Sequence, residues 1–286
     1  TSKTYAVALA RRLRTSWEDV GLTFVERTFK FTDGLDTSGW EIRGRCDAGP
    51  TVILTHGWSD SRYGALLWTP LLADHAARII VFDQRGHGDS AAPVSHLGVN
   101  GRDDLIDIIC QCEPFPNGLV LYGYSMGAIV SIAAAAKLGT RVNGVIADGP
   151  YRLPLEPIDG FLRYRKLPPW LFHAPVALCL WALLGRASNF DMAHVARDVA
   201  CPLLVLHGTE DHLCPHGSAQ AVAEAAPRGT FVSFPGGSHL DLAVTDIDRY
   251  LDALRRYFSQ LSSNRESQTH ESTATGRPNR SHAAQG

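Results

Sequence analysis

The sequence predicts an α/β fold, with a mostly parallel, doubly wound sheet and a small helical cap insertion. Three features support this prediction: short apolar runs typical of buried strands, helical stretches between them, and one segment rich in proline and tryptophan that interrupts the alternation. Apolar strands that alternate with helices are typical of a parallel sheet covered on both faces. Such sheets bind ligands beyond the carboxyl ends of their strands, so the loops there are the first place to expect function.

The elements follow in a regular order. Residues 1–21 resemble a helical segment, and residues 22–45 a leading hairpin, because alternating apolar and polar residues flank the turn signal Asp33-Gly34. Helical stretches then separate the apolar strands of an α/β domain that we expect over residues 22–258. The predicted strands are 51–54, 79–82, 119–122, 142–147, 203–206 and 230–234.

Two segments depart from this alternation. Residues 151–200 contain prolines, two tryptophans and a long apolar run, and we expect a compact helical cap there. Three roles stay open for its apolar side chains: anchoring the cap to the core, forming an acyl-binding wall, or meeting a membrane surface together with Arg163, Arg165 and Lys166. Residues 259–286 are polar, and we expect them to be disordered, because they bury too little surface to offset the entropy of ordering.

The composition excludes several classes of function. A net charge of −2 over 286 residues, without a basic stripe, argues against a nucleic-acid partner. The six cysteines show no zinc-ligand spacing, so we expect no metal site and reduced thiols. No signal peptide and no long apolar span is visible, and a cytoplasmic protein is the expectation. The oligomeric state leaves no trace in the sequence.

The pentapeptide Gly-Tyr-Ser-Met-Gly at 123–127 lies between a predicted strand and an alanine-rich helix. The two glycines allow a sharp reversal of the chain, which would project the Ser125 hydroxyl from the sheet. A serine hydroxyl needs a neighbouring base to become a nucleophile, and that base needs an acid to hold its tautomer. Ser125 is therefore a candidate nucleophile if both partners follow along the chain.

Candidates for both partners follow later strands. Asp211 comes after the 203–206 strand, and His239 lies in a glycine-rich loop after the 230–234 strand. We predict Ser125 as nucleophile, His239 as base and Asp211 as acid. Glu210 and Asp148 are alternative acids, the latter because it follows the preceding strand.

A tetrahedral intermediate also needs hydrogen-bond donors for its oxyanion. The backbone N–H of Met126 follows the nucleophile directly, and the N–H of Trp58 follows His56-Gly57 after an earlier strand. These two are the predicted oxyanion-hole donors. The segment "DQRGHGDS" contains Asp83 and Arg85, to which we assign a bracing role and no catalysis.

The ordered set "THGWSDS", "DQRGHGDS", "GYSMGA", "LHGTEDHLCP" and "GGSHLD" resembles the α/β-hydrolase superfamily, in its serine esterase, thioesterase and aminopeptidase-like branch. The resemblance covers roughly residues 25–258. It implies a carboxylesterase- or lipase-like hydrolase that cleaves an ester or thioester through an acyl-enzyme, with no cofactor and no metal. Amide hydrolysis or acyl transfer on the same residues stays open, and a catalytically dead binding module is the least favoured alternative. The expected partner is a small acyl ester or thioester, in an apolar pocket. Its candidate lining residues are Trp58, Tyr124, Tyr151, Trp170 and Trp181.

Overall fold

The computed structural model describes residues 21–275, apart from 93–94, 96–97, 99–100 and 186–189. Its centre is an eight-stranded sheet with the order β1-β2-β4-β3-β5-β6-β7-β8. The first two strands and the β2–β4 pair are antiparallel, and every other neighbouring pair is parallel. The predicted fold class is therefore confirmed. The strands are β1 (Phe24–Lys30), β2 (Asp36–Arg43), β3 (Thr51–Thr55), β4 (Arg78–Phe82), β5 (Leu119–Tyr124), β6 (Gly144–Asp148), β7 (Leu203–Gly208) and β8 (Gly229–Phe234).

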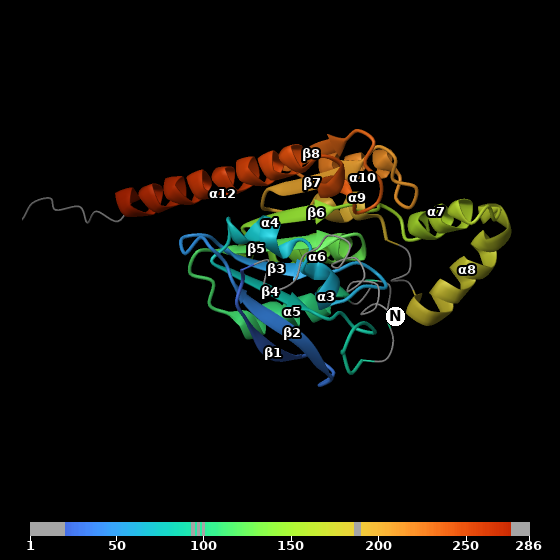
Figure 1. Ribbon diagram of the computed structural model, residues 1–286, viewed down its shortest axis with the longest axis horizontal. Coiled ribbons are helices and arrows are strands. Elements are labelled where there is room, and N and C mark those ends of the chain that lie inside the picture. The colour runs from blue at the N-terminus through green and yellow to red at the C-terminus, as the bar shows by residue number, and fades with distance from the viewer. Residues whose placement is uncertain (1–20, 93–94, 96–97, 99–100, 186–189, 276–286) are drawn as a thin grey trace, which may run out of the picture.

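Helices cover both faces of this sheet (Figure 1). Those described are α3 (Arg62–Ala65), α4 (Thr69–Ala73), α5 (Gly101–Cys112), α6 (Met126–Leu138), the short 3-10 helix η1 (Gly139–Arg141), α7 (Glu156–Tyr164), α8 (Pro169–Leu184), α9 (Met192–Ala196), α10 (His216–Ala225), α11 (Leu242–Thr245) and α12 (Ile247–Thr275). The six predicted parallel strands are all present, and the leading hairpin is β1–β2. The helical segment predicted over residues 1–21 lies outside the described part, except for its last residue, Gly21.

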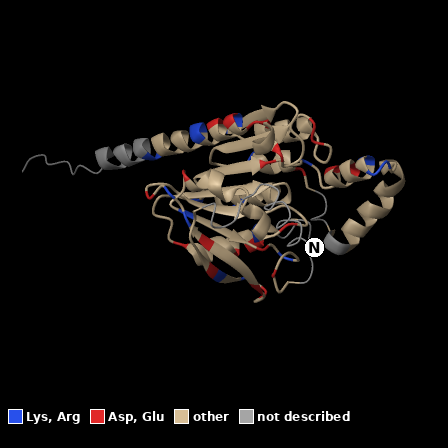
Figure 2. Ribbon diagram, viewed as in Figure 1, with Lys and Arg blue, Asp and Glu red and all other residues tan. Residues whose placement is uncertain are grey.

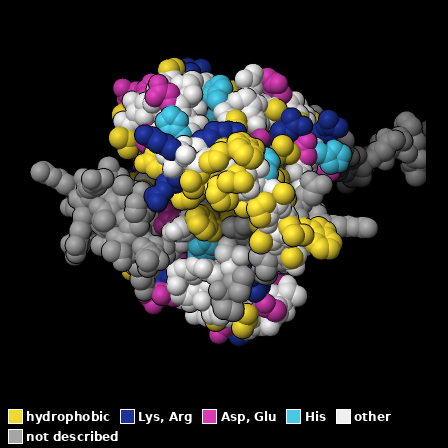
Figure 3. Space-filling model, turned by 90° about the vertical axis from the view of Figure 1, so that its right-hand side faces the viewer, with side chains coloured by type: hydrophobic (Ala, Val, Ile, Leu, Met, Phe, Trp, Pro, Cys, Tyr) yellow, Lys and Arg dark blue, Asp and Glu magenta, His cyan; other side chains and the backbone are white. Residues whose placement is uncertain are grey.

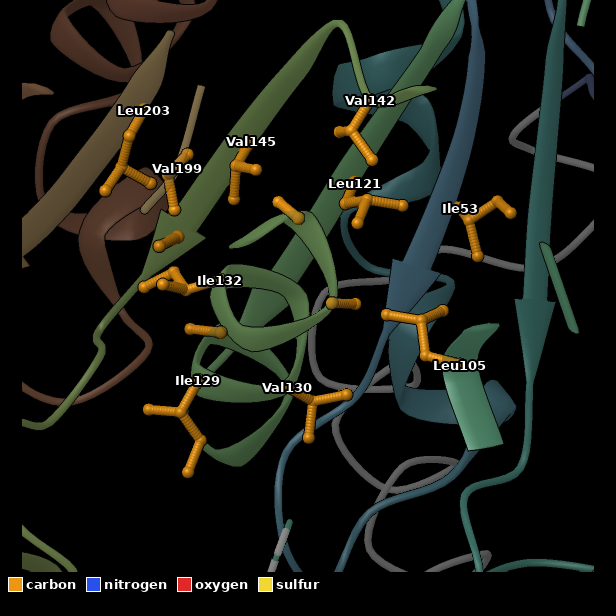
Figure 4. Close-up of a cluster of buried hydrophobic side chains, with 14 of the residues drawn as sticks. Ile53, Leu105, Leu121, Ile129, Val130, Ile132, Val142, Val145, Val199 and Leu203 are labelled. Carbon is orange, nitrogen blue, oxygen red and sulfur yellow. The ribbon is translucent and has the colours of Figure 1, made fainter. Parts of the chain in front are cut away.

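Alternating side chains of the strands build two cores. On one face, Ile53 and Leu121 pack with α5, α6, α9 and α10, as Figure 4 shows for part of this cluster. On the other face, Val52 and Tyr122 pack with α3, α4 and α12. Because both sides of each central strand are buried, these strands are apolar throughout, which is why the sequence predicts them well. The two cores hold the strand ends rigidly in place.

The C-terminal segment corrects one expectation. Residues 259–275 are helical rather than disordered, because α12 continues through them to Thr275. The helix is nucleated where Tyr250, Leu254 and Phe258 are buried against the sheet. Extending an existing helix costs far less than starting one, so a polar sequence can continue it. Residues 276–286 lie outside the described part.

Reduced thiols and the absence of a membrane-spanning segment were two further expectations. All six cysteines are free thiols. Within the described residues, no helix combines the length and the apolar character needed to cross a bilayer.

Candidate active site

Ser125 occupies the sharp turn between β5 and α6. Its backbone lies at φ 52° and ψ −119°, a region that side chains other than glycine rarely adopt. A Cβ on Gly123 would collide with the carbonyl of Gly127, and one on Gly127 would collide with the carbonyl of Thr55. Both glycines are therefore required for the turn, as predicted from the pentapeptide. The Ser125 N–H donates to the carbonyl of Asp148 on β6 at 2.8 Å, which fixes the turn to the neighbouring strand.

The loops after β7 and β8 bring two further side chains to Ser125. His239 Nε2 lies 3.0 Å from Ser125 Oγ, and His239 Nδ1 lies 2.7 Å from Asp211 Oδ2. An ionised carboxylate can only accept, so Nδ1 carries the proton and Nε2 is free to accept from the serine hydroxyl. Three side chains that are far apart in the sequence thus form one hydrogen-bonded chain.

The surroundings of Asp211 keep its carboxyl ionised. Burial opposes ionisation, but the hydrogen bond from the nearby His239, the Cys214 N–H and the adjacent His207 ring outweigh it and lower the pKa of Asp211. Both oxygens are engaged, because the N–H groups of Leu213 and Cys214 each donate to Oδ1 at 2.8 Å. Only 1% of the Asp211 side chain is exposed, against 13% of that of His239. The alternative acid Glu210 is exposed instead.

His207 lies behind Asp211, a position that sequence reasoning did not predict. Its ring is completely buried, with Nε2 3.4 Å from Asp211 Oδ2 and 2.9 Å from the carbonyl of Cys214. Burial lowers the pKa of His207, so the ring is neutral and Nε2 donates. The i, i+4 spacing from Asp211 was visible in the sequence, but it gave no sign that the histidine is buried.

Asp148, the other alternative acid, lies at the end of β6 in a different setting. Its Oδ2 accepts hydrogen bonds from Trp68 Nε1 at 3.3 Å, Tyr122 OH at 3.0 Å and Tyr250 OH at 2.8 Å. Oδ1 is buried without a partner among the described residues. Burial raises the pKa of Asp148, and these donors do not compensate for it. Asp148 makes none of the recorded hydrogen bonds to the His239 ring.

The loop that contains Trp58 lies against the serine. A Cβ on Gly57 would lie 3.3 Å from Ser125 Cβ, which places Trp58 next to the turn that contains Ser125. His56 fixes this loop, because its Nε2 accepts from the Gln84 N–H at 2.9 Å and its Nδ1 donates to the Gly57 carbonyl at 2.7 Å. In the described part of the chain, no recorded hydrogen bond uses the Trp58 N–H. The Trp58 N–H is therefore available to a ligand beside Ser125. Met126 is the first residue of α6 and follows Ser125 directly, as the prediction requires.

The segment after β4 contains Asp83 and Arg85, and Asp83 links this segment to the start of α3. Asp83 is completely buried and accepts from the backbone N–H groups of Arg62 and Asp89, at 2.7 and 2.8 Å. It also pairs with the Arg62 guanidinium. Arg85 forms a two-pronged contact with Asp104 on α5. Neither Asp83 nor Arg85 has a recorded contact with Ser125 or His239.

The five candidate pocket residues lie in different surroundings. Tyr124 is fully buried, with its hydroxyl 2.7 Å from Asp60 and its ring stacked on Trp68, so it supports the turn from below. Tyr151 is buried against Phe190. Trp58 is 62% exposed beside Ser125. Trp170 and Trp181 are exposed on α8, and a role in a substrate pocket stays a prediction for all five.

Asp211, Cys214 and His239 form the one group of possible metal ligands found among the described residues. Their ligand atoms lie within 4.8 Å of one another. A cation there would compete with the proton that His239 shares with Asp211, and the buried Cys214 would have to ionise although burial raises its pKa. The donor set therefore fits the hydrogen-bonded chain better than a metal ion.

A hollow of about 650 Å³ lies at the opposite edge of the sheet. It is lined by residues such as Pro50, Asn143 and Pro202, which precede the strands, and by Arg255 and Phe258 of α12. The serine turn follows the carboxyl end of β5. This hollow is therefore separate from the candidate active site.

Known proteins resemble this chain over most of its length. The uncharacterized protein YqkD of Bacillus subtilis is 24% identical over 242 residues, which are 82% of this chain and 78% of that protein. An esterase of Pyrococcus furiosus has a similar structure with a TM-score of 0.70, at 20% identity, covering 86% of this chain and 95% of that one. A thermophilic esterase of Thermogutta terrifontis has a TM-score of 0.61, at 25% identity, covering 84% and 99%.

The family model described as alpha/beta hydrolase fold matches residues 50–201, which include β3, the serine turn and the cap. The sheet order, the strained serine between strand and helix, and the structural likeness to esterases agree with this match. The chain belongs to the α/β-hydrolase fold family.

Proposed function

We propose that the protein is a serine hydrolase that cleaves a carboxylic ester or thioester through an acyl-enzyme. One observation supports this above all: His239 lies between Ser125 and Asp211, 3.0 Å from the hydroxyl and 2.7 Å from the carboxylate. The first distance is within the range for proton transfer from the hydroxyl to the imidazole, and the second is that of a hydrogen bond that holds the ring in place. The likeness to an esterase at 25% identity supports ester cleavage in particular.

In the proposed reaction, Ser125 Oγ attacks the carbonyl carbon while His239 Nε2 takes the hydroxyl proton. Asp211 stabilises the imidazolium, and its lowered pKa keeps it ionised at neutral pH. The N–H groups of Trp58 and Met126 would hold the oxyanion. His239 then returns the proton to the leaving alcohol or thiol, and water repeats the sequence on the acyl-enzyme.

The test is Ser125→Ala, assayed with a short p-nitrophenyl ester. We expect kcat to fall by several orders of magnitude, to about 10³-fold above the uncatalysed rate, because the oxyanion donors stay in place. Ser131→Ala is the matched control, since it removes a buried hydroxyl of α6 that has no recorded hydrogen bond. Equal rates for the two variants would refute the proposal.

A fluorophosphonate probe with site mapping should label Ser125 in the wild-type protein and nothing in Ser125→Ala. Absence of labelling in the folded protein would favour a binding module instead. Amide hydrolysis and acyl transfer need the same three side chains. A panel of ester, thioester and aminoacyl-amide substrates, compared by kcat/KM, separates them from ester hydrolysis.

A further inference from the structure

Helices α7 and α8 form a hairpin that projects from one side of the body (Figure 1). The first of them is fixed in place. Gly160 lies so close to the backbone of His212 and Leu213 that a Cβ there would collide with it, and Glu156 accepts from Ser218 Oγ at 2.6 Å. The α7 helix is therefore anchored beside the loop that contains Asp211, and it holds α8 away from the sheet.

The α8 helix contains no Asp, Glu, Lys or Arg (Figure 2), yet many of its side chains are exposed. Phe172 and Val176 are partly buried and Leu180 is buried, and their spacing of four places them on one side of the helix. The other side exposes Trp170 at 77%, Leu178 at 63% and Trp181 at 61%. A soluble surface rarely leaves side chains of this size uncovered together.

The end of α7 and the turn after it extend this apolar surface. Tyr164 is 69% exposed, and Phe161 and Leu167 are also exposed. Figure 3 shows hydrophobic side chains gathered on this face of the molecule, with Lys and Arg side chains beside them. We call the cap surface the set of Phe161, Tyr164, Leu167, Trp170, Leu171, Leu178 and Trp181 with the cations Arg163, Arg165 and Lys166.

The charges of the cap surface have one sign. Arg163, Arg165 and Lys166 are exposed, and no ion pair with an acidic side chain is recorded for them within the described residues. The two acidic residues of the hairpin have other partners. Glu156 accepts from Ser218, and Asp159 pairs with His173 at 2.7 Å. A positive rim beside an apolar face is complementary to an anionic lipid surface.

We propose that the cap surface docks on an anionic lipid bilayer. Tryptophan and tyrosine side chains favour the boundary between head groups and acyl chains, where the ring is buried and its polar edge stays hydrated. The α8 helix has 16 residues, fewer than the roughly 20 that span a bilayer, so it would lie along the surface. This inference goes beyond the proposed function and does not depend on it.

The test measures binding of the full chain to vesicles by flotation, with phosphatidylcholine alone and with phosphatidylserine added. We expect binding to the mixed vesicles. Trp170→Ser with Trp181→Ser should weaken it by roughly a hundredfold, since two aromatic side chains that would enter the bilayer are lost. Val25→Ser with Val244→Ser is the matched control, because both valines are exposed and lie outside the cap surface.

The cations should be tested separately. Replacing Arg163, Arg165 and Lys166 by Gln should weaken binding to the mixed vesicles by roughly a hundredfold and leave weak binding to phosphatidylcholine unchanged. The control replaces Arg43, Arg255 and Arg256, which are similarly exposed, by Gln. Circular dichroism should show the same fold in every variant.

Three outcomes would overturn the proposal. One is absence of wild-type binding to the mixed vesicles. Another is a dimer in analytical ultracentrifugation that the tryptophan variant abolishes, because a second copy would then cover the surface. The third is a tryptophan variant that binds vesicles as well as the wild type does but has a changed KM for long-chain esters. The surface would then be an acyl-binding wall. Vesicle binding is measured independently of turnover. If Ser125→Ala kept its activity, the proposed function would fail but the vesicle test would still decide this inference.

Discussion

Asp211 and Asp148 are two buried aspartates at the carboxyl ends of neighbouring strands, and their surroundings have opposite effects. Asp211 follows β7 and has donors on both oxygens, from His239, Leu213 and Cys214. Asp148 ends β6, where one oxygen has donors and the other has none among the described residues. The pKa is lowered for Asp211 and raised for Asp148, although burial raises both.

This difference shows that depth of burial does not decide which carboxylate can serve a histidine. The imidazole N–H of His239 and two backbone N–H groups stabilise the ionised form of Asp211. The neutral phenols and the indole that surround Asp148 stabilise it less. The acid that the geometry supports is therefore Asp211, and Asp148 has the character of a structural group that links Trp68, Tyr122 and Tyr250.

Replacing Asp211 and replacing Asp148 should differ most in their effect on turnover. Asp211→Asn should lower kcat for a p-nitrophenyl ester by about 10⁴-fold, because the amide favours the wrong tautomer of His239. Asp148→Asn should change kcat by less than about tenfold, since the hydrogen bonds of the His239 ring go to Ser125 and Asp211 and not to Asp148. Glu210→Gln, an exposed neighbour, is the control. A loss in Asp148→Asn as large as that in Asp211→Asn would reverse the assignment.

The second expected difference is in how the free energy of unfolding depends on pH. Asp211 and Asp148 should contribute to that dependence with opposite signs. Asp211 has a lowered pKa when folded, so its contribution is present above pH 3.8 and is lost as the pH falls through the folded value. Asp148 has a raised pKa when folded, so its contribution is present below pH 3.8 and is lost as the pH rises through the folded value.

Urea unfolding of the wild type and both variants over pH 3–8 measures this difference. Relative to the wild type, Asp148→Asn should gain stability as the pH rises above 3.8, by at most about 1.4 kcal/mol per pH unit. Asp211→Asn should lose relative stability as the pH rises toward 3.8. Slopes of the same sign in both variants would contradict the contrast.

The sequence predicts the parts of this site that depend on local chemistry. The glycines around Ser125 and the positions of Asp211 and His239 after strands are visible as residue types at fixed places. The strand order also follows general rules, so β8 lies beside β7 and its loop returns toward Ser125.

Other features depend on contacts between distant residues, and no spacing displays them. Trp68 and Tyr250 reach Asp148 from 80 and 102 positions away, so its setting could not be predicted. The apolar run of α8 is compatible with a packed cap or an uncovered one, and the structure was needed to show that Trp170 faces solvent. Residues 259–275 were expected to be disordered because composition ignores the buried helix that precedes them.

The smallest effect concerns the phenol that supports Asp148. Tyr250→Phe removes the donor at 2.8 Å from Oδ2 and the contact with Tyr122 OH at 2.6 Å. We expect the free energy of unfolding to fall by about 1–2 kcal/mol, because a buried carboxyl loses a partner. Turnover should change by less than about threefold, since the hydrogen bonds of His239 are untouched. Tyr164→Phe, which alters an exposed phenol, is the control for urea unfolding. A selective loss of kcat without loss of stability would show that the Asp148 cluster acts on His239 after all.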